Sequence, residues 1–528
     1  AARIRAAMRV DVPVGVFFAF PTVEGLAAWI AGEGAPGEAD DPSVLGPADR
    51  SRPIPLSAEQ ERLWFLSYVG DTESSYTVSK GLRLEGIEID LGRLARSFSI
   101  VVERHEALRT VFPAVEGQGR QHVLPPAPFV LPSVDLRAVP ARERPAETRR
   151  VAGLEAVRPF DLERGPLFRA LVVRTGDTEY VLLTNLHHIV TDAWSTGILV
   201  QELMECYQAL STGREPVLPR LPVQYADYAG WQRRWLESPA ADEQLRYWKR
   251  QLAGLPALDL CPDRARPARV SYRGGSLRMQ LSAELSARLR ALAERERVTL
   301  FMLLLAGFKV VLAHYSRQRD VVVGIDAANR RTVELERLIG FFINELVLRS
   351  DLSGDPAFTA LLGRVRDVTL GAYQNQDLPF GLLVKELVGR RDLGTNPLFQ
   401  VMFGLKNAPR PDVALDGLRV HPVEVASEVA VFELCLYMEE TPREIFGLFT
   451  YRTDLFDAAT IEAMRSDLVE VLERVSEHPG VGVEELVGNL GVRERERRAE
   501  RTRIAEQAGR RMLKSVQRKA IPITSPPE

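Results

Sequence analysis

Hydrophobic and polar residues in the first half of the chain follow two different periods, and the switch between them predicts alternating strands and helices. Apolar residues alternate over 180–186, which is typical of a strand, and the apolar positions from Ile198 to Leu203 recur at helical spacing. The segment 187–195 therefore lies where a strand ends and a helix begins. This first set of alternating elements runs to about residue 235.

The second half of the chain repeats this organisation. A period-2 strand is predicted over 277–281 and is followed by a predicted helix over 283–296. The apolar stretch 298–308 predicts a buried helix, and residues 321–325 predict another strand. The pattern as a whole indicates an α/β protein with two halves.

Composition fits this organisation and narrows the function classes. The chain has 528 residues, 45% of them hydrophobic, which is enough for more than one domain. A net charge of -3 gives no electrostatic footprint for nucleic acid. No signal peptide is visible at the start, and the stretch 298–308 is shorter than a membrane span of about 20 residues. Because Cys206, Cys261 and Cys435 are scattered and odd in number, we expect a reducing, cytoplasmic location. From the charge and the short apolar stretch, we expect no membrane or nucleic-acid partner.

Two of the seven histidines, His187 and His188, lie together at the predicted end of the first strand. Adjacent strand residues point to opposite faces, so the two rings do not readily share one metal ion. An imidazole held over a cleft suits proton transfer near neutral pH. Asp192 lies at the predicted helix start, where it would cap free amides or pair with a distant cation. Two interpretations of these residues remain open. They form a catalytic site, or they are a packed histidine beside an aspartate that caps the helix.

With its neighbours, the segment 187–192 resembles the His-His-x-x-x-Asp-Gly core of condensation domains from non-ribosomal peptide synthetases. Other segments resemble further motifs of that family, in the expected order. These segments are 55–66, 104–112, 225–232, 339–344, 376–380 and 391–400. Because the collinear matches extend over residues 53 to about 485, the chain is identified as a member of this family.

The resemblance implies a fold of two lobes, each like a chloramphenicol acetyltransferase subunit, forming a V-shaped pseudo-dimer with the active site in a tunnel between them. The lobes would comprise residues 53–235 and 236–490. Periodicity alone indicates only two α/β halves.

The resemblance also implies amide formation. An acyl or peptidyl thioester on an upstream carrier protein would be attacked by the amine of an aminoacyl thioester on a downstream carrier. Those carriers and other domains of the same synthetase would be the partners. The 4'-phosphopantetheine arms would arrive covalently on the carriers, and the domain itself would bind no metal and no diffusible cofactor.

Residue roles follow from the same resemblance. His188 matches the functionally decisive histidine of the motif, as a general base or as a group that positions the amine, and both roles stay open. His187 would support the fold from the other face of the strand. Asp192 would hold the loop by pairing with an arginine, for which Arg330 is the best candidate and Arg331 a competitor.

Two further residues and three departures from the family pattern complete the predicted site. Ser195 and Asn344 would line the site or satisfy local backbone. Ala193 replaces the motif glycine, and we expect its methyl group to narrow the tunnel or to set a substrate preference without loss of activity. Gly381 replaces the usual glutamate of the sixth motif, and residues 394–395 replace Ser-Arg in the seventh. We expect these last changes to affect surfaces or supporting loops.

The two ends of the chain differ from the body. Residues 1–31, with a predicted helix over 21–30, resemble the C-terminal part of a peptidyl carrier protein; the alternative is a leading helix of the main domain. The serine that carries phosphopantetheine in such a domain is not among them, so we expect no loading there. Residues 32–52 read as a linker. Residues 491–528 predict a charged connector to a downstream domain, or a charged helix that packs back on the second lobe.

Several related functions remain alternatives. A heterocyclisation domain would carry aspartates in place of the histidine pair, whereas epimerising and ester-forming members would share it. Residues 62–66 and 192–195 look closer to condensing members that accept L-configured donors. A non-catalytic recruitment platform is a candidate from a different class, although degenerate members lose the pair that this chain keeps.

Overall fold

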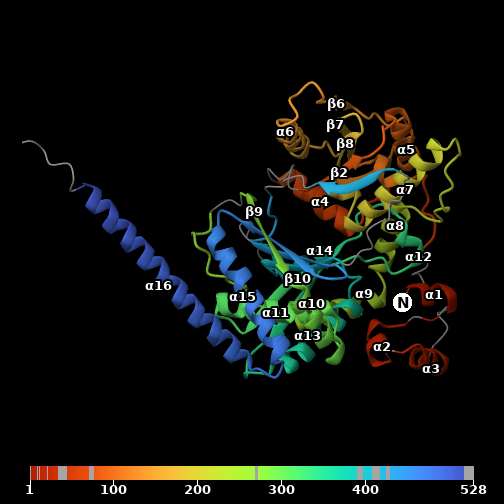
Figure 1. The fold of residues 1–528 in the computed structure, drawn as a ribbon. Helices are drawn as coiled ribbons and strands as arrows, with labels where there is room; N and C mark the ends of the chain where they lie inside the picture. The colour runs from red at the N-terminus through yellow and green to blue at the C-terminus, as the bar shows by residue number, and fades with distance from the viewer. Residues whose placement is uncertain are drawn as a thin grey trace, which may run out of the picture.

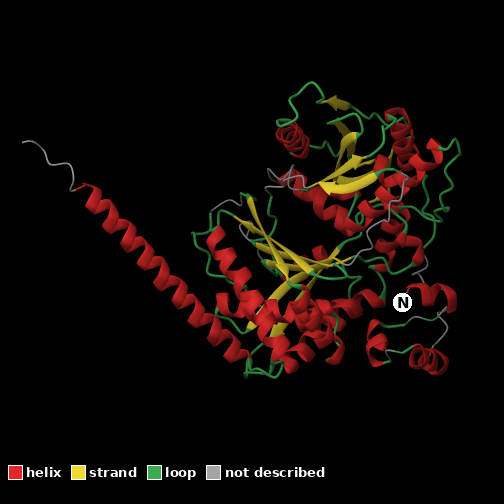
Figure 2. Ribbon diagram, in the orientation of Figure 1, coloured by secondary structure: helices red, strands yellow, loops and turns green. Residues whose placement is uncertain are grey.

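Two mixed α/β lobes make up the body of the protein, as the computed structural model shows (Figure 1, Figure 2). The structure describes residues 2–8, 10, 12–20, 22–33, 45–69, 76–267, 271–388, 396–406, 417–423 and 429–516.

The first lobe is built on a five-stranded sheet in the order β13-β2-β8-β7-β6. Its strands are β2 (Thr77–Glu85), β6 (Ser133–Asp135), β7 (Phe168–Arg174), β8 (Glu179–His187) and β13 (Arg419–Val423). Apolar residues of α5 (Leu91–Arg104) and α7 (Ala193–Ser211) pack on one face, and those of α6 (Arg144–Ala156) pack on the other. Covered on both faces, β8 is buried along almost its whole length.

A smaller sheet and two helices complete this lobe on the side of the second lobe. The sheet contains β1 (Ile54–Pro55), β3 (Thr110–Val111), β4 (Ala114–Val115) and β5 (Gln118–Val123). The helices are α4 (Ala58–Val69) and α8 (Tyr225–Trp235), and α8 ends at the predicted boundary between the halves.

The second lobe is built on a six-stranded sheet in the order β11-β10-β12-β14-β15-β9. The strands are β9 (Gly274–Leu281), β10 (Asp320–Ala327), β11 (Asn344–Asp351), β12 (Val401–Lys406), β14 (Leu434–Glu440) and β15 (Ile445–Arg452). The helices are α9 (Pro239–Gln251), α10 (Ala283–Arg295), α11 (Leu300–Ser316), α12 (Val333–Glu336), α13 (Phe358–Gln374), α14 (Phe380–Leu387) and α15 (Ala458–Glu477). Figure 2 shows helices covering one face of this sheet while the other face turns toward the first lobe.

The elements predicted from periodicity are present at their predicted positions. The apolar stretch after residue 298 forms α11, which Thr299 caps by accepting a hydrogen bond from the amide of Met302 at 3.2 Å. Strand β13 was not predicted. It comes from the chain of the second half, yet it pairs antiparallel with β2 of the first lobe, from Arg419↔Glu85 to Val423↔Gly81.

The first and last described helices lie outside the main sheets of the two lobes (Figure 1). Helices α1 (Ala2–Met8), α2 (Val14–Ala19) and α3 (Val23–Glu33) form a small group, and α1 and α2 contact α12 and α13. The end of the predicted linker is anchored, because Arg50 forms ion pairs with Glu106 and Asp227.

The last described element is α16 (Val483–Val516), which begins against the second lobe and then extends away from the body (Figure 1). The start of the charged tail packs on the second lobe, where Arg493 and Arg497 pair with Glu470 and Asp467, and the connector to a downstream domain stays a prediction. Among the described residues, no single helix is long and apolar enough to cross a membrane; only the pair α10 and α11, bent by 107°, passes that test jointly.

Candidate active site

His187 is the last residue of β8 and His188 follows it directly, and their side chains lie in different environments. Residues 188–190 form a short 3-10 turn between β8 and α7. His187 is buried, and its Nδ1 accepts a hydrogen bond from the amide of Ile189 at 3.1 Å. Burial lowers the pKa of His187 to about 3, so this ring is a neutral packing group.

His188 instead lines a large cavity between the lobes. Its Nδ1 lies 2.8 Å from the carbonyl oxygen of Thr191. Because a carbonyl only accepts hydrogen bonds, Nδ1 carries the proton and Nε2 keeps its lone pair. Burial is the largest influence on the pKa of His188 and lowers it below the usual value, although Asp192 opposes that effect. The ring is therefore held neutral, with a free hydrogen-bond acceptor and base.

The cavity has a volume of about 1520 Å³ and is lined by both lobes. The first lobe contributes residues of α4, β2 and α7, and the second contributes residues of β9, β10, β11, β12, β14 and β15. Phe341, which also lines it, packs edge-on against the His188 ring with 4.9 Å between ring centroids. The volume exceeds the range of about 300–1,000 Å³ that is usual for small-molecule sites.

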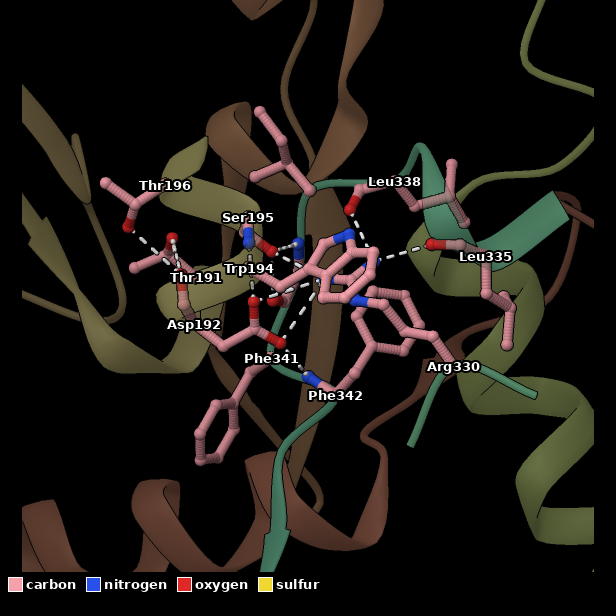
Figure 3. Close-up of polar contacts among 12 residues, drawn as sticks. Thr191, Asp192, Trp194, Ser195, Thr196, Arg330, Leu335, Leu338, Phe341 and Phe342 are labelled. Atoms are coloured by element: carbon pink, nitrogen blue, oxygen red, sulfur yellow. Dashed lines mark hydrogen bonds and ion pairs between the residues drawn. The ribbon is translucent and has the colours of Figure 1, made fainter. Parts of the chain in front are cut away.

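Asp192, four residues after His188, joins the two lobes (Figure 3). Its Oδ1 accepts a hydrogen bond from the amide of Ser195 at 2.7 Å and caps α7, and its Oδ2 accepts one from the amide of Phe342 at 3.1 Å. Arg330 reaches the same carboxylate, with Nη2 3.1 Å from Oδ1. The side chains of Asp192 and Arg330 are only 1% and 2% exposed, so this is a fully desolvated ion pair.

The remaining donors of Arg330 fix the loop that follows β10. Nη1 donates to the carbonyl oxygens of Leu335 at 2.5 Å and Leu338 at 2.7 Å, and the guanidinium lies 4.0 Å from the centroid of the Phe342 ring. The competitor Arg331 pairs with Asp377 instead. The structure thus brings Asp192 together with Arg330.

Ser195 and Asn344 are both buried, but they lie in different places. The Ser195 hydroxyl donates to the carbonyl oxygen of Gly340 at 2.9 Å and accepts from Arg330 at 2.7 Å, so it belongs to the contact between the lobes. Asn344 lines the cavity, and its amide also bonds to the backbone of the sixth motif at Gln376, Leu378 and Phe380.

Gly340 shows why the fifth motif needs a glycine. A Cβ atom at this position would lie 2.0 Å from a ring carbon of Tyr225. The Tyr225 hydroxyl donates to the carbonyl oxygen of Phe341 at 2.6 Å and also contacts Ser57 at 2.9 Å. Segments from the first, fourth and fifth motifs therefore meet at one contact between the lobes.

The departures from the family pattern fall in three different environments. Ala193 is the exposed first residue of α7, and the cavity wall on this helix comes from Thr196 and Val200. Gly381, for which we expected an effect on surfaces or supporting loops, lines the cavity, because the start of α14 folds against α4 and brings it there. Residues 394–395 lie outside the described residues.

A metal site is not evident in the described part of the chain, where no three His, Cys, Asp or Glu side chains are grouped closely enough to hold an ion.

The sequence around this site is similar to a known protein family. A family model described as "Condensation domain" matches residues 50–490. The chain belongs to the condensation-domain family. Condensation domains of non-ribosomal peptide synthetases are acyltransferases whose general reaction is peptide-bond formation.

Relatives of this condensation domain are much longer proteins. One of the linear gramicidin synthase proteins from Brevibacillus parabrevis is 44% identical over 482 residues, which cover 90% of this chain and 9% of that protein. Phosphinothricin tripeptide synthetase PhsB from Streptomyces viridochromogenes is 39% identical over 478 residues, covering 90% of this chain and 40% of that protein. The chain thus spans a minor part of the relatives it matches.

Solved structures share the fold of this condensation domain. The X-domain from teicoplanin biosynthesis is 30% identical with a TM-score of 0.76, covering 84% of this chain and 99% of that chain. The first condensation domain of the calcium-dependent antibiotic synthetase has a TM-score of 0.71 at 20% identity, covering 83% and 99%. At that identity, the second likeness shows the fold alone.

Sequence reasoning missed several polar and charged residues of the cavity. Arg62, Asp326, Glu345 and Tyr437 all line it. Arg62 lies inside the first motif and Glu345 directly follows the fifth, so their closeness to these motifs is a sequence signal for a place near the site. Asp326 and Tyr437 belong to strands β10 and β14, whose place in one sheet brings them together only in three dimensions.

Proposed function

We propose that this chain is a catalytically active condensation domain that forms an amide bond between two carrier-bound thioesters, with an L-configured donor. The observation that supports the proposal is the state of His188. The Thr191 carbonyl holds the proton on Nδ1, and burial keeps the ring neutral, so Nε2 presents a lone pair in a cavity that both lobes line.

The reaction balances around this imidazole. The neutral amine of the acceptor attacks the thioester carbonyl of the donor, a C–N bond forms, and Nε2 accepts the proton that the nitrogen loses. The C–S bond then breaks, and the departing thiolate takes a proton from the imidazolium. Nε2 either removes the proton or only orients the amine by accepting a hydrogen bond; holding two tethered reactants together contributes to the rate in both cases.

The partners in this proposal are an upstream and a downstream peptidyl carrier protein within one synthetase. Each would bring its substrate on a covalent 4'-phosphopantetheine arm, and the domain would need no cofactor of its own. Residues 1–31 would be the C-terminal part of the upstream carrier, and the two lobes would correspond to a chloramphenicol-acetyltransferase-like pseudo-dimer. The helical group α1 to α3 and the separate main sheets of the two lobes are compatible with this proposal.

A reconstitution tests the proposal. The chain is mixed with donor and acceptor carriers loaded with defined thioesters, and the acceptor carrier is analysed by mass spectrometry. We expect a coupled product with an L-donor, and a loss of about 100-fold or more in rate for His188→Ala. His122→Ala, which changes an exposed histidine on β5, is the matched control.

The same assay separates the alternatives. Coupling to a hydroxyl but not to an amine would indicate an ester-forming enzyme, and inversion of one tethered substrate without coupling would indicate an epimerising one. Preference for a D-donor would contradict the L-donor assignment. If no product forms and His188→Ala changes nothing, the catalytic proposal is wrong. A recruitment role would then be favoured, since the similar teicoplanin X-domain has been solved in complex with OxyB.

A further inference from the structure

Two carboxylates project from the second lobe into the cavity that holds His188. Asp326 on β10 and Glu345 on β11 are direct neighbours in the antiparallel register, and both line the cavity. Side chains of directly opposed residues lie on the same face about 5 Å apart, where like charges destabilise the sheet. A pair of this kind on the cavity wall is therefore stabilised by a positively charged partner.

Arg62 supplies only part of that partner. Its guanidinium pairs with Oε1 of Glu345 at 2.9 Å. Oε2 of Glu345 is buried and accepts no hydrogen bond from any residue that the structure describes. The Tyr437 hydroxyl donates to Oδ2 of Asp326 at 2.7 Å, but that donor carries no charge. Arg62 thus pairs with one of the two carboxylates, and an acceptor oxygen is left over.

Nearby lysines do not complete the arrangement. The Lys406 ammonium lies 5.4 Å from the centroid of the Tyr437 ring, and within the described ranges it has no ion pair with Asp326. Its charge acts on Asp326 from a distance only. Lys80 also lines the cavity, where burial and the charge of Lys406 lower its pKa.

We propose that Asp326 and Glu345 form a subsite for a cationic group, an ammonium or guanidinium on the side chain of one of the two acyl groups that the domain joins. The inference rests on the proposed function and names its substrate class. A cation placed here would donate a hydrogen bond to Asp326 and would be attracted by the charge of Glu345 in a partly desolvated wall, where such interactions are stronger than in water. Burial, opposed by Tyr437 and reinforced by Glu345, raises the pKa of Asp326 to about 6, so Asp326 is available as a carboxylate at neutral pH.

Coupling assays with matched substrates test the subsite. Lysyl and norleucyl groups, which differ in side-chain charge, are loaded in turn on the acceptor and on the donor carrier, and kcat/KM is measured for each. We expect the unmodified domain to favour lysyl at one of the two positions. Asp326→Asn and Glu345→Gln should each lower the lysyl-to-norleucyl ratio at that position about 10-fold or more, with norleucyl coupling retained.

Controls separate this inference from loss of fold and from loss of function. Asp351→Asn removes a carboxylate from the same strand, β11, at its exposed end and should leave the ratio unchanged. An unchanged ratio in both cavity variants, or an equal loss for both substrates, would overturn the subsite. Calorimetric binding of lysyl- and norleucyl-pantetheine amides makes the same comparison without turnover. Absence of coupling with either substrate, together with selective binding of the lysyl amide, would contradict the proposed function and not the subsite.

Discussion

At the scale of single residues, one backbone carbonyl decides which nitrogen of His188 is available for chemistry. The Thr191 oxygen fixes the tautomer, and the buried ring is kept neutral. His187 has the same side chain one residue earlier but accepts a hydrogen bond from the backbone and packs in the core. Position on the strand end, not residue type, separates the two roles.

The lowered pKa of His188 is directly measurable. In the protein labelled with carbon-13 histidine, the His188 resonance should titrate with a midpoint below the usual value of about 6.5, because burial disfavours the imidazolium. The resonance is assigned by its disappearance in His188→Ala. A midpoint above 7 would mean that the ring is protonated when the amine arrives, and the role of base would have to be abandoned.

The buried pair of Asp192 and Arg330 predicts a large stability effect. Asp192→Asn keeps the cap of α7 but leaves the guanidinium without a counter-charge, so the free energy of unfolding should fall by about 3–5 kcal/mol. Denaturant titration measures the change. Asp49→Asn, at an exposed aspartate, should alter stability by less than about 0.5 kcal/mol. A loss below about 1 kcal/mol for Asp192→Asn would show that the pair is not held as described.

At the scale of elements, α11 carries a lysine into the core of the second lobe. Lys309 is fully buried, and its ammonium donates to the carbonyl oxygens of Val321 at 3.1 Å and Leu348 at 2.6 Å. These carbonyls belong to β10 and β11, so the side chain ties the helix to the two strands that also carry Asp326 and Glu345. Burial lowers the pKa of Lys309 to about 7.

This shift makes the stability of the lobe pH-dependent. Between pH 7 and about 10 the unfolded chain binds a proton at this lysine that the folded state does not, so stability rises with pH in that window and the gain is lost as pH falls to 7. Relative to Lys309→Met, the free energy of unfolding should rise by about 1.4 kcal/mol per pH unit. Denaturant titrations at pH 7, 8 and 9 check this, with the exposed Lys385→Met as control. Parallel pH profiles for the unmodified chain and Lys309→Met would refute it.

Elements with a local signal were predictable, and those that depend on distant pairing were not. The strand β8, the helix α7 and the buried α11 follow from apolar spacing within each segment. The contact of Asp192 with Arg330 was expected from the family resemblance and not from periodicity. Strand β13 and the opposition of Asp326 to Glu345 depend on which strands pair, and a single sequence carries no signal for that pairing.

At the scale of the whole molecule, α16 leaves the second lobe from a fixed attachment (Figure 1). Asp467 on α15 is fully buried and accepts two hydrogen bonds of 2.7 Å from Arg497 and one of 2.9 Å from Tyr315. From Arg498 to Val516 the helix continues for roughly 28 Å at 1.5 Å per residue. The Asp467 contact is therefore the most buried of the ion pairs that hold the base of this arm on the second lobe.

Removing that contact should loosen the arm. Asp467→Asn deprives Arg497 of its charge partner, and amide hydrogen exchange in α16 around residues 493–500 should accelerate about 10-fold or more, while β10 and β11 keep their protection. Glu470→Gln, which breaks a more exposed pair with Arg493, should have a smaller effect. Equal exchange in Asp467→Asn and the unmodified chain would place the attachment elsewhere.

The pairing of β13 with β2 ties the second half of the chain to the first lobe. Because a strand from the second half adds to the edge of the first sheet over five residue pairs, any movement that carried β13 away with the second lobe would break that ladder. Pro422 and Val423 of this strand line the cavity, so β13 both joins the halves and forms part of the wall that encloses His188.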